Sequence, residues 1–352
     1  MSAAADILRT CAPTVGLSPD LVPFPREGTL AERLSACPFL MAPMAGVSDA
    51  AYRIMARAGG ASLAYTEMVS VAGLHYGGEK TWELVDPQDP EPDIAVQLFG
   101  SKPDQFREAV AAVSERLGSR LVLVDVNMAC PVPKVVRKGE GSALLDAPEL
   151  AAGIVRACLA EAKVPVTVKI RRGRIGAHEV APEFARAMEQ AGVSAVAVHG
   201  RYGDQLYRGE ADWGAVRRVA AAVSVPVIGS GDVRGPQEAA QMLAETGATA
   251  VMVARGTYGN PWVFGDARRV LGGEVVTAPT PERRLAALRM HVRLLDATGA
   301  HLARARSLAG WYLRGLPNAA SLRDRAVRCE SLDEYLELLD EASARMATTD
   351  AR

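Results

Sequence analysis

Short apolar runs alternate with amphipathic stretches along most of the chain. Between about residues 36 and 275, each apolar run has the length of a buried strand, and the stretch after it has helical spacing. This alternation is typical of repeated βα units and a parallel sheet. We predict helices such as Pro103–Leu117, Pro148–Ala162, Pro182–Ala191 and Gly235–Thr246. We predict eight strands, at Phe39–Pro43, Ser62–Glu67, Ile94–Phe99, Leu121–Asn127, Val166–Ile170, Ala195–His199, Val227–Gly229 and Ala250–Val253.

Eight such units favour a (β/α)₈ TIM barrel over a doubly wound sheet. Small or polar residues stand where each predicted strand ends, and barrel enzymes place their active sites at that end. A purely structural protein would have little reason to gather them there. These residues include Pro43, Met44, Ala45, Glu67, Gln97, Asn127, Lys169, His199, Ser230, Asp232, Ala254 and Arg255.

The pattern becomes continuously helical after about residue 280. We therefore predict three parts: an N-terminal extension without clear periodicity (1–35), an α/β barrel as the catalytic domain (36–275) and a C-terminal all-helical domain (280–352). From Arg283 to Arg328 there are ten arginines against two acids, a local charge of +8. A solvated helix face is the ordinary explanation, but so few acids favour a basic patch for phosphate backbones. Arg304 and Arg306 represent this patch.

Composition narrows the class of protein. The 352 residues are 49% hydrophobic and 23% charged with a net charge of −1, values typical of a soluble globular protein. No apolar run is long enough to span a membrane, and the N-terminus lacks the features of a signal peptide. Five scattered cysteines without a Cys-x-x-Cys pair suggest neither disulfides nor a metal site. We expect a cytoplasmic protein that is a monomer.

One cysteine stands in an unusual setting. Cys130 follows the fourth predicted strand and precedes a proline, in a loop that also holds Lys134, Arg137 and Lys138. A thiol there is a plausible proton donor, and the cations suit a polyanionic substrate. An inert buried thiol is the equally balanced alternative.

The other strand ends suggest a flavin. An inward lysine such as Lys169 needs an anion or an electron-rich acceptor, which the pyrimidine carbonyls of a flavin would supply. Gln97 could hydrogen-bond to the same edge of the ring, and His199 could donate to the flavin. A histidine at the barrel rim that is hydrogen-bonded only within the protein is an equally ordinary explanation for His199. The segments Gly229-Ser-Gly-Asp232 and Ala254-Arg-Gly256 suit a terminal phosphate, with turn formation as the alternative.

These segments together resemble one known family. They are Ala42-Pro-Met-Ala-Gly-Val-Ser-Asp49, Val96-Gln-Leu-Phe-Gly100, Asp125-Val-Asn-Met-Ala-Cys-Pro131, Arg137-Lys-Gly-Glu-Gly-Ser-Ala143, Val168-Lys-Ile-Arg171, Val198-His-Gly-Arg201, Gly229-Ser-Gly-Asp232, Gly259-Asn-Pro-Trp262 and Gly310-Trp-Tyr-Leu-Arg-Gly-Leu-Pro317. The chain resembles the tRNA-dihydrouridine synthases from residue 39 to about residue 330, most of all the bacterial B-type branch.

The resemblance implies an FMN oxidoreductase that converts chosen uridines of tRNA to 5,6-dihydrouridine. NADPH would reduce the flavin and leave, the flavin N5 would pass a hydride to C6 of the uracil, and Cys130 would give a proton to C5. The tRNA would be held by residues that include Asn127, Lys134, Arg137, Lys138 and Arg201. The FMN contacts would be Pro43, Met44, Ala45, Gln97, Lys169, His199, Ser230, Gly231, Asp232, Ala254 and Arg255.

This chain departs from the family pattern in three places. Ser230 replaces a usual Asn and Ala254 a usual Gly, both small enough to keep backbone contacts with phosphate, and Tyr202-Gly203 replaces a usual Thr-Arg. Two other interpretations remain: an FMN barrel enzyme that acts on a free pyrimidine, and an RNA-binding protein without catalysis. The first would not need the basic helical domain, and the second would not need the complete flavin set with Cys130.

Overall fold

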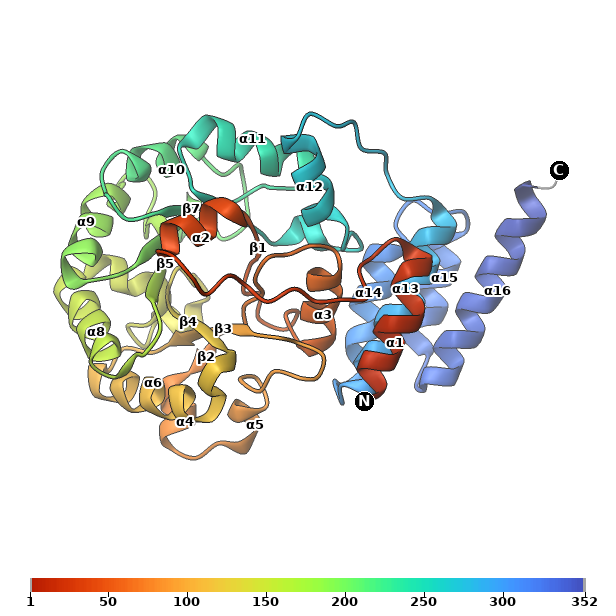
Figure 1. The fold of residues 1–352 in the computed structure, drawn as a ribbon, viewed down its shortest axis with the longest axis horizontal. Helices are drawn as coiled ribbons and strands as arrows, with labels where there is room; N and C mark the ends of the chain where they lie inside the picture. The colour runs from red at the N-terminus through yellow and green to blue at the C-terminus, as the bar shows by residue number, and fades with distance from the viewer. Residues whose placement is uncertain (1, 351–352) are drawn as a thin grey trace.

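Eight parallel strands form a (β/α)₈ barrel in the computed structural model, which describes residues 2–350 (Figure 1). Neighbouring strands follow chain order, and β1 pairs with β8 through Phe39 and Val251. The strands are almost wholly buried, because helices cover the outside and side chains fill the inside. They are β1 Phe39–Met41, β2 Val69–Ser70, β3 Ile94–Phe99, β4 Leu121–Met128, β5 Val166–Gly173, β6 Ala195–Tyr202, β7 Val227–Ser230 and β8 Ala250–Val253.

The barrel closes differently from the prediction at its second position. A regular strand was expected over Ser62–Glu67, but the structure has isolated bridges there, Met41 with Ala64 and Tyr65 with Ala95. The chain then bends at Glu67, and the short β2 rejoins β3 beyond the bend. The prediction of a continuous strand is therefore wrong, although the segment does lie between β1 and β3.

The outer helices follow the local signals of the sequence closely. α6 begins at Pro103, where a missing N–H has no cost, and α11 ends before Gly247, whose φ of +71° lets the chain turn away. The helices around the barrel are α3 Ala50–Ala58, α4 Val71–His75, α5 Glu79–Trp82, α6 Pro103–Leu117, α7 Pro133–Val136, α8 Pro148–Glu161, α9 Ala181–Ala191, α10 Trp213–Ala220, α11 Pro236–Thr246 and α12 Val263–Leu271. Short 3₁₀ helices are η1 Pro13–Val15, η2 Gly118–Arg120, η3 Gly141–Asp146, η4 Arg255–Thr257 and η5 Leu302–Arg304.

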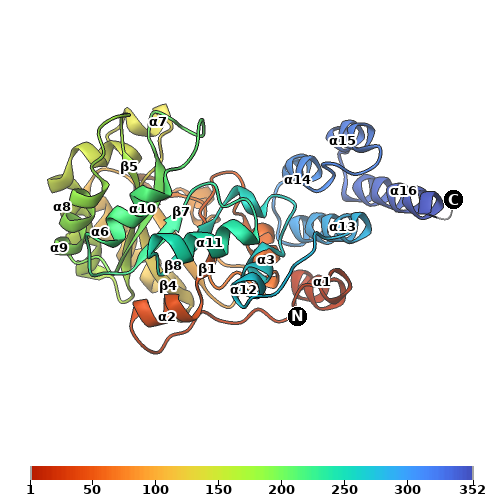
Figure 2. The ribbon, with the colours of Figure 1, turned by 90° about the horizontal axis from the view of Figure 1, so that it is seen from above.

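The N-terminal extension contains two helices that the sequence pattern did not reveal, α1 Ala3–Cys11 and α2 Leu30–Ala36. In α2, Leu30 and Leu34 pack against side chains inside the barrel, at the end opposite α7 (Figure 2). The extension thus closes the bottom of the barrel and leaves the other end open.

The chain after the barrel is entirely helical within the described residues. It comprises α13 Pro281–Ala297, α14 Ala305–Tyr312, α15 Ala319–Arg328 and α16 Leu332–Asp350, here called the helical region. α1 lies beside α13 in both views, and its buried Leu8 belongs to the same apolar core as Leu288 (Figures 1 and 2). Val15 strengthens this junction, because its carbonyl accepts hydrogen bonds from Trp262 Nε1 and Arg283 Nε. None of the helices described is both long and apolar enough to cross a membrane.

Candidate active site

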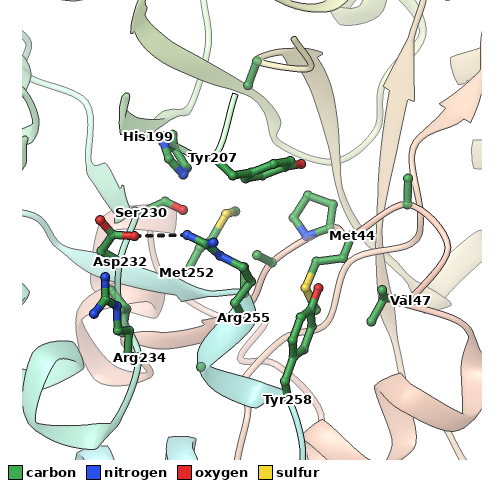
Figure 3. Close-up of a pocket in the computed structure, with 18 of the residues that line it drawn as sticks. Met44, Val47, His199, Tyr207, Ser230, Asp232, Arg234, Met252, Arg255 and Tyr258 are labelled. Carbon is green, nitrogen blue, oxygen red and sulfur yellow. Dashed lines mark hydrogen bonds and ion pairs between the residues drawn. The ribbon is translucent and has the colours of Figure 1, made fainter. Parts of the chain in front are cut away.

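A cavity of about 1120 Å³ opens at the carboxyl ends of the strands. Residues from all eight positions around the barrel line it, and the helical region adds Arg284, Trp311 and Arg314 on one side. Figure 3 shows part of this lining, with His199, Ser230, Asp232 and Arg255 around the space. The predicted site residues that line it are Pro43, Met44, Ala45, Gln97, Asn127, Cys130, Lys169, His199, Arg201, Ser230, Gly231, Asp232, Ala254 and Arg255.

Three predicted residues lie outside the cavity lining. Lys134 is in the short α7, and Arg137 and Lys138 follow it. All three are exposed, and none of their side chains has an ion pair within residues 2–350. Their charge therefore faces solvent at the cavity end of the barrel, available to an approaching anion.

The backbone around Cys130 is held in place by its neighbours in sequence. Asn127 Oδ1 accepts hydrogen bonds from the N–H groups of Ala129 (3.1 Å) and Cys130 (2.8 Å). On the other side, Ser142 N donates to the carbonyl of Cys130 at 2.9 Å. Asn127 Nδ2 in turn donates to Gln97 Oε1 at 2.8 Å, so the thiol loop is tied to the base of the cavity.

Cys130 is suited to keep its proton. Burial raises the pKa of the Cys130 thiol, and neither the hydrogen bond with the Val132 backbone nor the cations Arg171, Lys169 and Lys134 reverse this shift. The group is therefore a neutral thiol at physiological pH and a potential acid.

Lys169 is a buried cation that forms no hydrogen bond or ion pair within residues 2–350. Its side chain lines the cavity. Burial lowers the pKa of Lys169 to about 8, with help from the nearby Arg171 cation. A ligand that offers an anion or a carbonyl oxygen would satisfy this group.

His199 presents a donor to the same space. Its Nδ1 accepts a hydrogen bond from the backbone N–H of Arg201 at 3.2 Å, which leaves the ring proton on Nε2. Burial lowers the pKa of His199 well below its usual value, and the cations Lys169, Arg171, Arg201 and Arg255 act in the same direction. The imidazole is therefore neutral and carries a donor proton on Nε2.

The loops after β7 and β8 provide free backbone donors. The N–H groups of Asp232, Val233 and Arg255 form no hydrogen bond within the part of the chain that the structure describes. Gly231 adopts a φ of +115°, and a Cβ there would lie only 2.7 Å from Ala211 Cβ, so glycine is required for this turn. Unpaired amides beside Arg255 suit a phosphate group.

Arg201 and Asp232 have structural contacts that the sequence could not reveal. Arg201, almost fully buried, donates from Nη2 to Asp232 Oδ2 at 2.8 Å. Arg255 donates to the other carboxylate oxygen at 3.1 Å, the contact drawn in Figure 3. Although burial raises the pKa of Asp232, hydrogen bonds from Arg201 and Ala211 N hold it below its ordinary value. The carboxylate fixes the loop, so only its backbone is available for a ligand.

The structure adds residues to the cavity that were not predicted as site residues. Arg171 donates to the carbonyls of Ala129, Tyr202 and Leu206 and lies 5.9 Å from the ring of Tyr207. Arg171 could have been predicted from the sequence, because it lies two residues after Lys169 and therefore on the same face of β5. Tyr207 lies in a loop and Trp311 in the helical region. The alternation of side chains along a strand, which located the other site residues, does not apply to either of them.

Comparisons with known proteins identify the family of this chain. A tRNA-dihydrouridine synthase B of Xanthomonas axonopodis pv. citri is 38% identical over 305 residues, 85% of this chain and 90% of the relative. A probable tRNA-dihydrouridine synthase 1 of Synechocystis is 37% identical over 309 residues, covering 86% and 85%. A solved mandelate oxidase with benzoyl-formic acid is 19% identical over 82% of each chain, with a TM-score of 0.44, too remote to bear on function. The sequence profile of the dihydrouridine synthase family matches residues 40–348, so the chain belongs to the dihydrouridine synthase (Dus) family.

Proposed function

We propose that this protein is a tRNA-dihydrouridine synthase that reduces the C5–C6 double bond of uridines in tRNA. FMN is the resident cofactor in this proposal, and NADPH is the reductant. The observation that carries it is the meeting, in one cavity, of a neutral thiol with a buried lysine and loop amides that have no hydrogen-bond partner among the described residues. Family membership and the names of the relatives support tRNA as the substrate.

The residues present fit FMN on chemical grounds. Lys169 and His199 Nε2 offer donors for the ring carbonyls, and Gln97 keeps one amide N–H free because its other contacts are to Asp125 and Asn127. The amides of the β7 and β8 loops, with Arg255, suit the phosphate. The other residues proposed to hold the flavin are Pro43, Met44, Ala45, Ser230, Gly231, Asp232 and Ala254. When bound and reduced, FMN supplies the hydride for C6 of the uracil.

The protein's own contribution is to position the uracil and supply a proton. Asn127 anchors the backbone of Cys130, so the thiol is held at the cavity wall with its proton available for C5. The uridine must leave the stacked RNA to reach it. The exposed Lys134, Arg137 and Lys138 are proposed to hold the RNA backbone during this step.

The proposal is tested with the purified full chain, unmodified tRNA transcript and NADPH. We expect an FMN absorption band at about 450 nm, and dihydrouridine detected by mass spectrometry. Free uracil and orotate should not be reduced. No dihydrouridine from any unmodified tRNA, or efficient reduction of a free pyrimidine, would overturn the proposal.

The acid role of the thiol has its own test. Cys130→Ala should keep bound FMN and NADPH oxidation but lose most uridine reduction, since the proton for C5 is missing. Cys158→Ala is the matched control, because that buried thiol lies in α8, away from the cavity lining. Wild-type rates of product formation in Cys130→Ala would refute the assignment.

A further inference from the structure

Arg304 links the helical region to the barrel. In the sequence it represents the basic patch, yet its Nη1 lies 2.9 Å from Glu67 Oε1 and 3.1 Å from Asp49 Oδ2. The two carboxylates are mostly buried, and the arginine side chain is 30% exposed. One cation from the helical region thus neutralises two acids that belong to the barrel.

Glu67 passes this contact on to the cavity wall. Its second oxygen, Oε2, accepts a hydrogen bond from the backbone N–H of Gly46 at 2.6 Å. Gly46 lies within the segment 43–48, whose Pro43, Met44, Ala45 and Val47 line the cavity. Glu67 therefore connects the segment 43–48 to the helical region.

Asp49 fixes the other end of the same segment. Its Oδ1 accepts from Tyr52 N at 2.9 Å and caps the first turn of α3, while its Oδ2 meets Arg304. Without the guanidinium, Asp49 and Glu67 would lose the cation they share, and Arg53, which also acts on Asp49, already pairs with Glu91. Repulsion between these carboxylates would displace Glu67 and its hydrogen bond to Gly46.

We propose that Arg304 and Glu67 are positioning residues that hold the segment 43–48 against the FMN and tie its geometry to the seating of the helical region. This inference rests on the proposed function, because it assigns that segment to the flavin. Arg304 acts through Glu67 and makes no phosphate contact.

The first test measures FMN affinity without tRNA, by the change in flavin fluorescence on binding to the full-length apoprotein. Arg304→Met and Glu67→Gln should each weaken FMN binding by between about 2-fold and about 30-fold, the range of long-range couplings. The double variant should bind FMN about as weakly as either single variant, because both changes break one connection. Arg304→Lys should restore most of the affinity, since a single nitrogen makes both contacts and a point charge can replace it.

Arg325→Met is the matched control. Arg325 pairs with a carboxylate within the helical region itself, Glu341 at 2.8 Å, and lies in α15, which is on the far side of α14 from the barrel (Figure 2). Its loss should leave FMN affinity unchanged. Equal weakening in Arg325→Met and Arg304→Met would show a general effect of charge or stability and would overturn the inference.

The second test separates positioning from RNA contact. The KM for tRNA is measured for Arg304→Met over a series of salt concentrations. A lost phosphate contact would reduce the slope of log KM against log salt by about 1, whereas a positioning residue leaves it unchanged and lowers kcat. Suppose that the wild type reduces tRNA, and that Arg304→Met has a reduced slope but normal FMN affinity. That result overturns this inference and leaves the proposed function standing. Weakened FMN binding in a protein that makes no dihydrouridine overturns the proposed function alone.

Discussion

Gly141 is a position where one added methyl group would press on the loop of Cys130. Its φ is +61°, and a Cβ there would lie 2.6 Å from the carbonyl oxygen of Cys130 and 3.1 Å from Cys130 Cβ. Gly139 is a natural comparison two residues away. Its φ is +74°, but an added Cβ would meet no atom within 4 Å.

The difference between the two alanine variants can be worked out from these contacts. Each variant places a side chain on a left-handed backbone, which lowers the free energy of unfolding by about 1 kcal/mol. Gly141→Ala must also move the carbonyl of Cys130, which accepts from Ser142 N at 2.9 Å, and the loss of that bond costs about 1 kcal/mol more. We expect a decrease in the free energy of unfolding of about 1 kcal/mol for Gly139→Ala and about 2 kcal/mol for Gly141→Ala.

The effect on catalysis should be larger than the effect on stability suggests. A displacement of about 1 Å in a reacting group can cost about 100-fold in rate, so a shift of a few tenths of an ångström predicts about a tenfold loss. The assay is single-turnover reduction of tRNA uridine by the reduced enzyme, beside urea unfolding and FMN content. Gly141→Ala should lose rate with its FMN retained, and Gly139→Ala should stay near wild type. Equal rates and equal stabilities in the two variants would refute the reasoning, because they would show that the contact with Cys130 is without consequence.

Three further changes test other parts of the structure. Because Lys169 is charged only below its pKa of about 8, FMN affinity should be highest below that pH and fall above it, in a fluorescence titration; Lys169→Met should bind FMN more weakly and show no such pH dependence, and a persistent dependence would exclude Lys169 as its source. Leu8→Ala, at a position 2% exposed between α1 and α13, should lower the free energy of unfolding in urea by about 2 to 4 kcal/mol. Leu159→Ala, at a position 37% exposed on α8, should change the free energy of unfolding by less than about 1 kcal/mol. Similar losses in Leu8→Ala and Leu159→Ala would show that the extension does not stabilise the fold. Lys134→Gln and Arg137→Gln should each reduce the salt dependence of tRNA KM by about 1 in slope without changing FMN affinity, and an unaltered slope would remove these residues from the RNA surface.

The sequence by itself determined the barrel, because its signals are local. Buried parallel strands require apolar runs, and helices between them require their own start and stop residues, such as Pro103 and Gly247. The register of polar residues at strand ends follows from the same alternation. For this reason the sequence alone places Gln97, Lys169 and His199 at one end of the barrel, and all three line the cavity.

The tertiary structure determined which partner each of these polar and charged side chains has. The sequence could not show that Arg304 meets Asp49 and Glu67, since those contacts join segments more than 230 residues apart, nor that Arg201 is buried against Asp232. It also missed that the extension closes the barrel and braces α13, because a helix as short as α1 is stabilised by packing and not by its own propensity. The local sequence pattern determines the helices and strands and the end of the barrel at which the polar site residues lie. Long-range packing and ion pairing decide which cations remain free for a ligand.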